Sequence, residues 1–311
     1  MLTVLLIFTR AVHIAASILI AGSVTFEVVT LGFAGPALSD DLREIERRLL
    51  RLAVWSLVTV LLSAVFWFWL ETVNMSGLSF ADGFSASVSR TVLLQTLFGR
   101  VWGLRVGLNA VATVFAVSGL VRNHARRRAL ILVLWLLSIA LLVSLAWISH
   151  AAAARVQPLG LLGDALHLCA AGGWLGGLIP FAIYLGRTRV SSGLSGRVAL
   201  GLKRYSTLSL CCVSVLVVSG ISNSWLLVGS IQALFTTPYG CLLLFKLILF
   251  RILIGFGARN RLAIKTNLPK IEARSDLLPE LRRNVICEAF LGAAVVVIVA
   301  CLGVTPPARH L

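Results

Sequence analysis

Long stretches without charge constrain this chain more than any other feature of its sequence. Only 13% of the 311 residues are charged, against about a quarter in an average soluble domain. Several uncharged windows are long enough to cross a bilayer as a helix, which takes about 20 residues. We predict eight spans, at residues 3–31, 49–72, 100–121, 129–149, 158–184, 205–229, 240–259 and 284–304. The sequence therefore predicts an all-α, polytopic membrane protein.

The organisation along the chain is simple. No connection between the spans is long enough to form a domain of its own, and no internal repeat is evident in the sequence. We therefore expect a single membrane domain over 1–311, folded as an eight-helix bundle.

The formal net charge of +16 is distributed unevenly between the connections. The first, third, fifth and seventh connections carry most of the basic residues, namely Arg43, Arg47, Arg48, Arg51, Arg122, Arg126, Arg127, Arg128, Arg187, Arg189, Arg197, Lys203, Arg204, Arg259, Arg261, Lys265, Lys270, Arg274, Arg282 and Arg283. Basic connections stay in the cytoplasm. This pattern predicts that both termini are periplasmic, and it explains the charge without a nucleic-acid partner.

The fifth predicted span contains polar residues that an apolar helix would normally exclude. It includes the stretch GDALHLCAAGGWLGG, at 163–177. At 100° per residue, Asp164, His167 and Trp174 share one face of a helix. The opposite face carries small residues, Ala165, Cys169, Gly172 and Gly176. We infer that one face packs closely on a neighbouring helix and that the other presents an acid, an imidazole and an indole.

The first span has a similar polar stripe, which includes Arg10, His13 and Glu27. The two residues His13 and Glu27 are 14 positions apart, or about 21 Å along a helix axis. They therefore belong to different sites. Glu27 either pairs with a basic residue of the inner leaflet or lies further along a conduction path.

Three histidines are expected in the outer third of the bilayer: His13, His150 and His167. Neutral imidazole is a common ligand of copper, zinc, iron and nickel. Asp164, one turn before His167, could accept a hydrogen bond that fixes the imidazole tautomer. Two simpler interpretations stay open: Asp164 and His167 satisfy each other or the backbone, or paired histidines bind haem in a membrane cytochrome.

Several stretches together resemble the CopD/PcoD family of copper-resistance and copper-uptake proteins. They are RAVHIAASILIAG, LFGRVWGLRVGL, SHAAAA, LHLCAAGGWLGGL, SGISNSWLLVGSIQALFTTPYGCLLLFKLIL and CEAFLGAAVVVIVACLGVTPP, in this order. The resemblance covers nearly the whole chain and is strongest over 145–308. It implies a multi-pass protein of the bacterial plasma (inner) membrane that moves copper from periplasm toward cytoplasm, and so contributes to copper homeostasis and resistance.

The resemblance also implies particular site residues and a partner. The family's membrane histidines fall on His13, His150 and His167, with other motif positions at Trp174, Tyr239, Gly240 and Lys246. The cargo is a copper ion, Cu(I) or Cu(II), and no chemical catalysis is expected. Members act alongside a periplasmic carrier of the CopC type. No such domain is fused within these residues, so we expect a separate carrier protein.

Further polar residues complete the candidate path, with Arg10, Glu27, Asp164, Trp174, Asn223 and Lys246 as supporting positions. Asn223 either lines the outer vestibule or forms hydrogen bonds between helices. Lys246 either snorkels or pairs with an acid such as Asp164 or Glu71. A third function stays open beside transporter and cytochrome: a membrane dock for a periplasmic copper carrier, without transport.

Overall fold

The computed structural model describes residues 1–32, 40–80, 82–121, 124–149, 157–188, 195–267 and 276–308. Throughout these ranges the regular structure is helical. The helices are α1 (Leu2–Thr25), η1 (Phe26–Leu31), α2 (Asp40–Ser76), η2 (Asp82–Phe84), α3 (Ala86–Gln95), α4 (Leu97–Val121), α5 (His124–Val143), η3 (Ser144–Ile148), α6 (Gln157–Arg187), α7 (Ser195–Val228), α8 (Ile231–Thr236), α9 (Pro238–Asn267) and α10 (Leu277–Leu302).

The prediction of eight membrane-spanning helices is confirmed. Eight helices in the described ranges are long and apolar enough to cross a bilayer. Four of them, α2, α7, α9 and α10, extend furthest beyond the predicted spans, in each case at the end that carries basic residues. The predictions ended where basic residues begin, whereas arginine and lysine are good helix formers, so the helices continue beyond the apolar segment.

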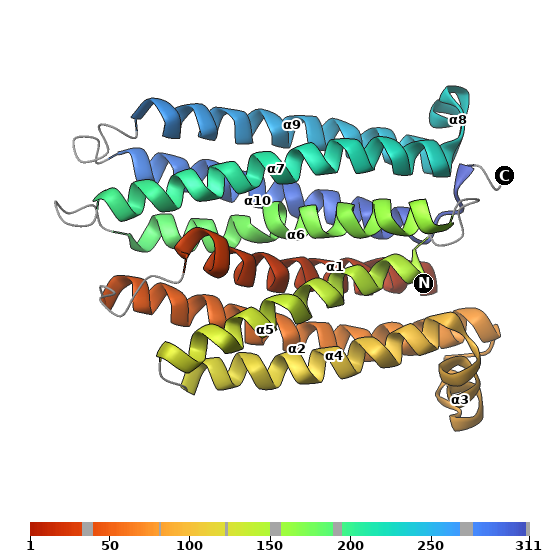
Figure 1. The fold of residues 1–311 in the computed structure, drawn as a ribbon. Helices are drawn as coiled ribbons and strands as arrows, with labels where there is room; N and C mark the ends of the chain where they lie inside the picture. The colour runs from red at the N-terminus through yellow and green to blue at the C-terminus, as the bar shows by residue number, and fades with distance from the viewer. Residues whose placement is uncertain are drawn as a thin grey trace.

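The two ends of the bundle differ in what they carry. Figure 1 shows both termini, α3 and α8 at one end, which we call the terminal end. The opposite end, which we call the basic end, includes Arg43, Arg127, Arg187 and Lys265 at or near the ends of the long helices. This separation of charge is the one that the positive-inside rule requires.

The bundle consists of two halves with the same order of elements. In each half two long helices are followed by a short helix at the terminal end and then by two more spans. The first half runs from α1 to η3 and the second from α6 to α10, and Figure 1 shows them one below the other. Because each half crosses the bundle four times, both start at the terminal end, as in a parallel repeat.

The junctions α3–α4 and α8–α9 match in detail. Thr96 (φ −103°, ψ 151°) and Thr237 (φ −107°, ψ 149°) are both extended. Their hydroxyl oxygens accept hydrogen bonds from the amides of Gly99 (2.9 Å) and Gly240 (3.1 Å). A Cβ at either glycine would overlap the backbone of the preceding short helix. The same sharp corner therefore begins α4 and α9.

The halves meet where α1 packs against α6. A Cβ at Gly22 would overlap the backbone of Gly176, so the two helices touch through these glycines. Each glycine lies nine positions after the histidine of its own helix, His13 or His167. The absence of an evident repeat in the sequence is thus corrected by the structure: few residue types match, but the architecture does.

Candidate metal site

His167 of α6 is held in one orientation by α7. Its Nδ1 lies 3.0 Å from Oγ of Ser219. The Ser219 hydroxyl donates its hydrogen to the carbonyl of Val215, at 2.6 Å. Since that hydrogen is used, the hydroxyl accepts from His167, and the ring carries its proton on Nδ1. The lone pair is left on Nε2, the atom available for a metal.

Two oxygen-bearing side chains accompany this imidazole. Nδ2 of Asn223 lies 3.4 Å from Oδ1 of Asp164, at the long end of hydrogen-bond distances. The Asn223 Oδ1 atom is buried and has no hydrogen-bond partner among the residues that the structure describes. A buried carbonyl oxygen without a donor costs about 1–3 kcal/mol. It is therefore a candidate to accept a ligand.

His150 lies outside the described residues, but the residue before it reaches this region. The hydroxyl of Ser149 donates to the carbonyl of Ala146 at 2.9 Å, and the Ser149 side chain interacts with the carboxylate of Asp164. The predicted ligand His150 thus directly follows a residue that contacts the acid one turn from His167.

Lys246 of α9 adds a positive charge to the surroundings of Asp164. The two groups interact electrostatically, with no ion pair or hydrogen bond for Lys246 among the described residues. Of the two interpretations, the structure favours interaction with Asp164 over snorkelling.

His13 of α1 has the same orientation as His167, set by α2. Its Nδ1 lies 3.0 Å from Oγ of Ser63, whose hydroxyl donates to the carbonyl of Thr59 at 2.7 Å. Its Nε2 lies 2.6 Å from a guanidinium nitrogen of Arg105. A guanidinium only donates, so Nε2 accepts that bond and Nδ1 carries the proton.

Arg105 of α4 is fixed in this position by other groups. Its side chain is 3% exposed and donates to the carbonyl of Leu141 and to the hydroxyl of Ser144. The position that a metal would take at His13 is therefore filled by a nitrogen of the protein. His13 can bind a metal only when Arg105 moves away.

The two histidine pockets correspond position by position. In each pocket, the residue three positions before the histidine contacts the residue four positions after the serine that orients the histidine. Arg10 lies over the ring of Trp67, at 5.0 Å from its centroid, and Asp164 bonds to Asn223. The cations are Arg105 and Lys246, each six positions after the corner glycine of its helix.

The acidic residue Glu27 lies near the basic end, within η1. An oxygen of Glu27 is 3.5 Å from Arg127, and the same guanidinium is 3.2 Å from Glu46. Of the two interpretations of Glu27, the structure favours pairing with a basic residue.

The ring of Trp174 is 2% exposed and packs edge-on against Phe250, with centroids 6.1 Å apart. It lines a cavity on the basic-end side of His167. The indole is therefore part of the wall between the candidate metal site and that cavity.

The structure places His13 and His167 in separate pockets. No group of three His, Cys, Asp or Glu side chains suited to a metal is present in the part of the chain that the structure describes. Sequence reasoning missed the roles of Ser63, Ser219 and Arg105. A signal was available for Arg105, because the Y-G-x5-K pattern of 239–246 recurs as F-G-x5-R at 98–105.

Comparison with known families gives two matches, one for each half. The family model described as "Copper resistance protein D-like, N-terminal domain" matches residues 1–157. The model described as "Copper resistance protein D" matches residues 199–302.

Curated relatives carry related names. Copper resistance protein D of Pseudomonas syringae pv. tomato is 30% identical over 223 residues, 70% of this chain and 71% of that protein. Inner membrane protein YebZ of Escherichia coli (strain K12) is 29% identical over 277 residues, 85% of this chain and 87% of YebZ. Copper transport protein CutJ of Bacillus subtilis (strain 168) is 26% identical over 251 residues, 80% of this chain but 44% of CutJ. No solved structure matches the chain.

Proposed function

Because the chain belongs to the copper resistance protein D family, we propose that this multi-pass protein of the bacterial inner membrane binds copper and transports it from the periplasm toward the cytoplasm. The positive-inside rule puts the terminal end in the periplasm. Copper enters there, delivered by a separate carrier of the CopC type. Transport in this direction contributes to copper homeostasis and resistance.

The copper site of the proposal is centred on His167. One observation carries it: Nδ1 is committed to Ser219, so Nε2 keeps a free lone pair, and Asn223, one turn after Ser219 on α7, has an unsatisfied amide oxygen. Metal-binding histidines characteristically donate their second ring N–H to a neighbouring acceptor. Asp164 supplies negative charge, and His150 supplies a second imidazole. Imidazole and carboxylate together form a donor set suited to copper.

Lys246 has a role that follows from its position near Asp164. Without cargo, its ammonium group compensates the charge of the carboxylate. A copper ion at Asp164 takes over that compensation and repels the ammonium group. Lys246 therefore competes with copper for the same carboxylate.

His13 remains a predicted ligand, on one condition. Its Nε2 becomes available when Arg105 gives up its bond to the imidazole. In the arrangement described above, the second half binds copper and the first half does not.

The test compares His167→Ala with the matched variant His13→Ala. The purified protein is titrated with copper, its absorption spectrum is recorded, and copper uptake into proteoliposomes is measured. We expect His167→Ala to lower copper affinity at least about tenfold and to stop uptake, because a metal ligand is lost. We expect His13→Ala to bind copper as the unchanged protein does.

Three results would contradict the proposal. Unchanged copper affinity in a folded His167→Ala variant would remove His167 from the site. Copper binding without uptake would favour a docking protein. A haem spectrum that is lost with His167 would favour a membrane cytochrome.

A further inference from the structure

A cavity of about 140 Å³ lies among α6, α7, α9 and α10, on the basic-end side of Trp174. Its walls are mostly apolar and aromatic, with Phe181 and Tyr205 among them. This volume is large enough for water, since a water molecule needs a cavity of at least about 10–15 Å³ on this measure. One wall carries a buried carboxylate, Glu288 of α10.

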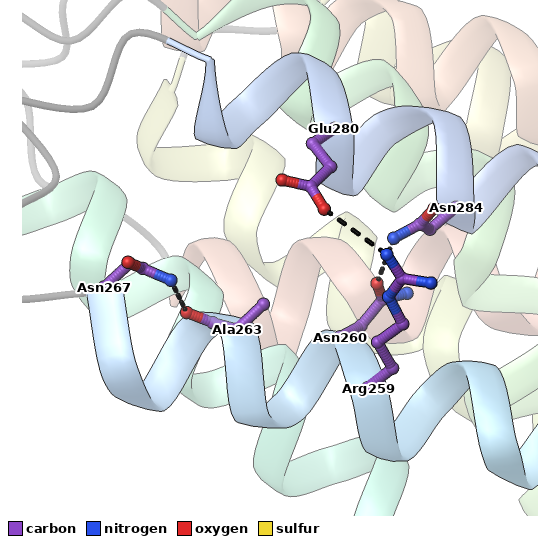
Figure 2. Close-up of polar contacts among 6 residues, drawn as sticks. All are labelled: Arg259, Asn260, Ala263, Asn267, Glu280 and Asn284. Carbon is purple, nitrogen blue, oxygen red and sulfur yellow. Dashed lines mark hydrogen bonds and ion pairs between the residues drawn. The ribbon is translucent and has the colours of Figure 1, made fainter.

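Glu288 is held by a chain of two amides. Its Oε1 accepts a hydrogen bond from Nδ2 of Asn260, and Oδ1 of Asn260 accepts one from Nδ2 of Asn284, at 3.0 Å. The pair of asparagines is seen in Figure 2 between α9 and α10. Both groups of the Asn260 amide are used, so the chain fixes one carboxylate oxygen. The other oxygen, Oε2, faces Gly257, which has no side chain to cover it.

No cation compensates this carboxylate among the described residues. Glu288 is 2% exposed and forms no ion pair in that part of the chain. Its own helix and α6 add only uncharged side chains to the described cavity wall. The charged or titratable groups that α7 and α9 add are Tyr205 and Arg261.

These two groups are committed elsewhere. The Tyr205 hydroxyl donates to the carbonyl of Trp174 at 3.0 Å. The Arg261 guanidinium donates to the carbonyl and the hydroxyl of Ser206, both at 2.9 Å. A charged group inside a membrane usually pairs with a partner or serves a function. Within the described residues, Glu288 lacks such a partner.

The side chains that line the cavity indicate which cation can neutralise the carboxylate of Glu288. Copper favours nitrogen and sulfur ligands, and none lines this cavity among the described residues. Sodium, magnesium and calcium need several oxygen ligands, but the amides of Asn260 and Asn284 are engaged with each other and with Oε1. A proton needs only one oxygen, and Oε2 is available.

We propose that Glu288 is a proton-binding site, which releases its proton when a cation enters the cavity and takes one up again when the cation leaves. The proton moves between Oε2 and water, and no electron is transferred. The coupling to copper rests on the proposed function. Geometry supports it, since Trp174 lies on the same face of α6 as His167 and seven residues further, or about 10 Å along the axis. The cavity therefore lies beyond Trp174 on the path from His167 toward the basic end.

Infrared spectroscopy tests proton binding without copper. Difference spectra between pH values are recorded for the purified protein, for Glu288→Gln and for the control Glu280→Gln. Glu280 lies two turns earlier on α10 and pairs with Arg259 at 3.8 Å, as Figure 2 shows. We expect a protonated-carboxyl band that Glu288→Gln lacks and Glu280→Gln retains. Glu288→Asp, which should shift the band without abolishing it, serves if the glutamine variant does not fold. A full, unshifted band in both Glu288 variants would overturn the proton site.

A second measurement tests the coupling. Proteoliposomes with a pH-sensitive dye report proton movement during copper uptake. We expect uptake to be accompanied by proton movement in the unchanged protein and in Glu280→Gln, with at least a tenfold smaller proton signal in Glu288→Gln. Uptake without proton movement in the unchanged protein would overturn the coupling alone. No uptake at all would overturn the proposed function and the coupling with it, while the infrared result would still decide the proton site.

Discussion

The two halves of the bundle treat their buried polar groups in opposite ways. In the first half, Arg105 occupies the lone pair of His13. Near the basic end of that half, Arg127 lies between Glu27 and Glu46. In each place a buried guanidinium lies against the group that could otherwise bind a ligand.

In the second half, His167 and the buried acid Glu288 have no arginine against them in the described residues. His167 has its Nδ1 against Ser219, Asn223 has an unsatisfied oxygen one turn later on α7, and the cation of this pocket is Lys246. Glu288 faces a cavity. Lysine is a mobile point charge, whereas the planar guanidinium forms several hydrogen bonds in a fixed fork. The type of cation, arginine at 105 and lysine at 246, is thus one difference between the pocket in which the imidazole is blocked and the pocket in which it is not.

The difference teaches that fold and function are separable within one chain. The corner at Thr96 repeats at Thr237, and Gly22 meets its counterpart Gly176, so the backbone is shared. Sites are determined by the side chains placed on such a backbone. We infer that the first half mainly stabilises the bundle and that the second half carries the copper chemistry.

The strongest test of this division is removal of its cations, by Arg105→Leu and Lys246→Leu. Loss of Arg105 leaves His13, the Leu141 carbonyl and Ser144 without a donor, and should lower the unfolding free energy by about 4 kcal/mol. Loss of Lys246 should lower it by less, because it leaves only the charge of Asp164 uncompensated and removes no hydrogen bond given for the described residues. Thermal unfolding in detergent measures both.

Copper titration of the same variants sharpens the result. Arg105→Leu frees Nε2 of His13, so the number of copper ions bound per chain should rise by one. Lys246→Leu should bind copper more tightly at an unchanged number. A folded Arg105→Leu variant that binds no additional copper would show that the first pocket lacks more than a free imidazole.

The next largest difference in unfolding free energy is expected between variants of the two buried acids, Glu27 and Glu288. Glu27→Gln removes a partner of Arg127 and should lower the unfolding free energy by about 3 kcal/mol, as expected when a buried ion pair is broken. Glu288→Gln keeps an acceptor for Asn260 and should cost less than about 1 kcal/mol. Equal losses in thermal unfolding would mean that Glu288 is also a structural ion-pair partner.

The sequence was sufficient to predict the spans, because each apolar run must cross the membrane as a helix. It also gave the polar faces of α1 and α6 through the positions of His13 and His167. These features depend on local periodicity alone.

Local periodicity could not predict how the two halves pack together, nor that Arg105 occupies the lone pair of His13. The Ser63 and Ser219 hydroxyls are ordinary residues of apolar helices, and they acquire a role only because α2 and α7 place them 3.0 Å from an imidazole. Arg105 is 92 positions from His13. Contacts over such separations depend on how helices pack, which hydrophobic periodicity leaves open.

The serines themselves separate a positioning role from a structural one. Ser219→Ala removes the acceptor that holds the proton on Nδ1 of His167, and should weaken copper binding about tenfold, as loss of a group that orients a metal ligand does. Ser63→Ala should leave copper affinity unchanged, because His13 is held by Arg105. Competition with a copper chelator measures both, and Ser219→Thr, which keeps the hydroxyl, should restore the affinity. Equal weakening in both alanine variants would place the two histidines in one site.

The smallest change in stability should come from variants of the threonine corners, where the two halves have the same geometry. Thr96→Ala and Thr237→Ala each remove a hydroxyl that accepts the amide hydrogen of a corner glycine, and loss of such a cap costs about 1 kcal/mol. Hydrogen exchange should become faster in the first turn of α4 and of α9 by a similar factor. Copper affinity should change only in Thr237→Ala, because the corner at Thr237 sets the position of Lys246 nine residues later. If Thr96→Ala changed copper affinity as much, the first half would contribute to the copper site, and the division between a stabilising half and a binding half would be wrong.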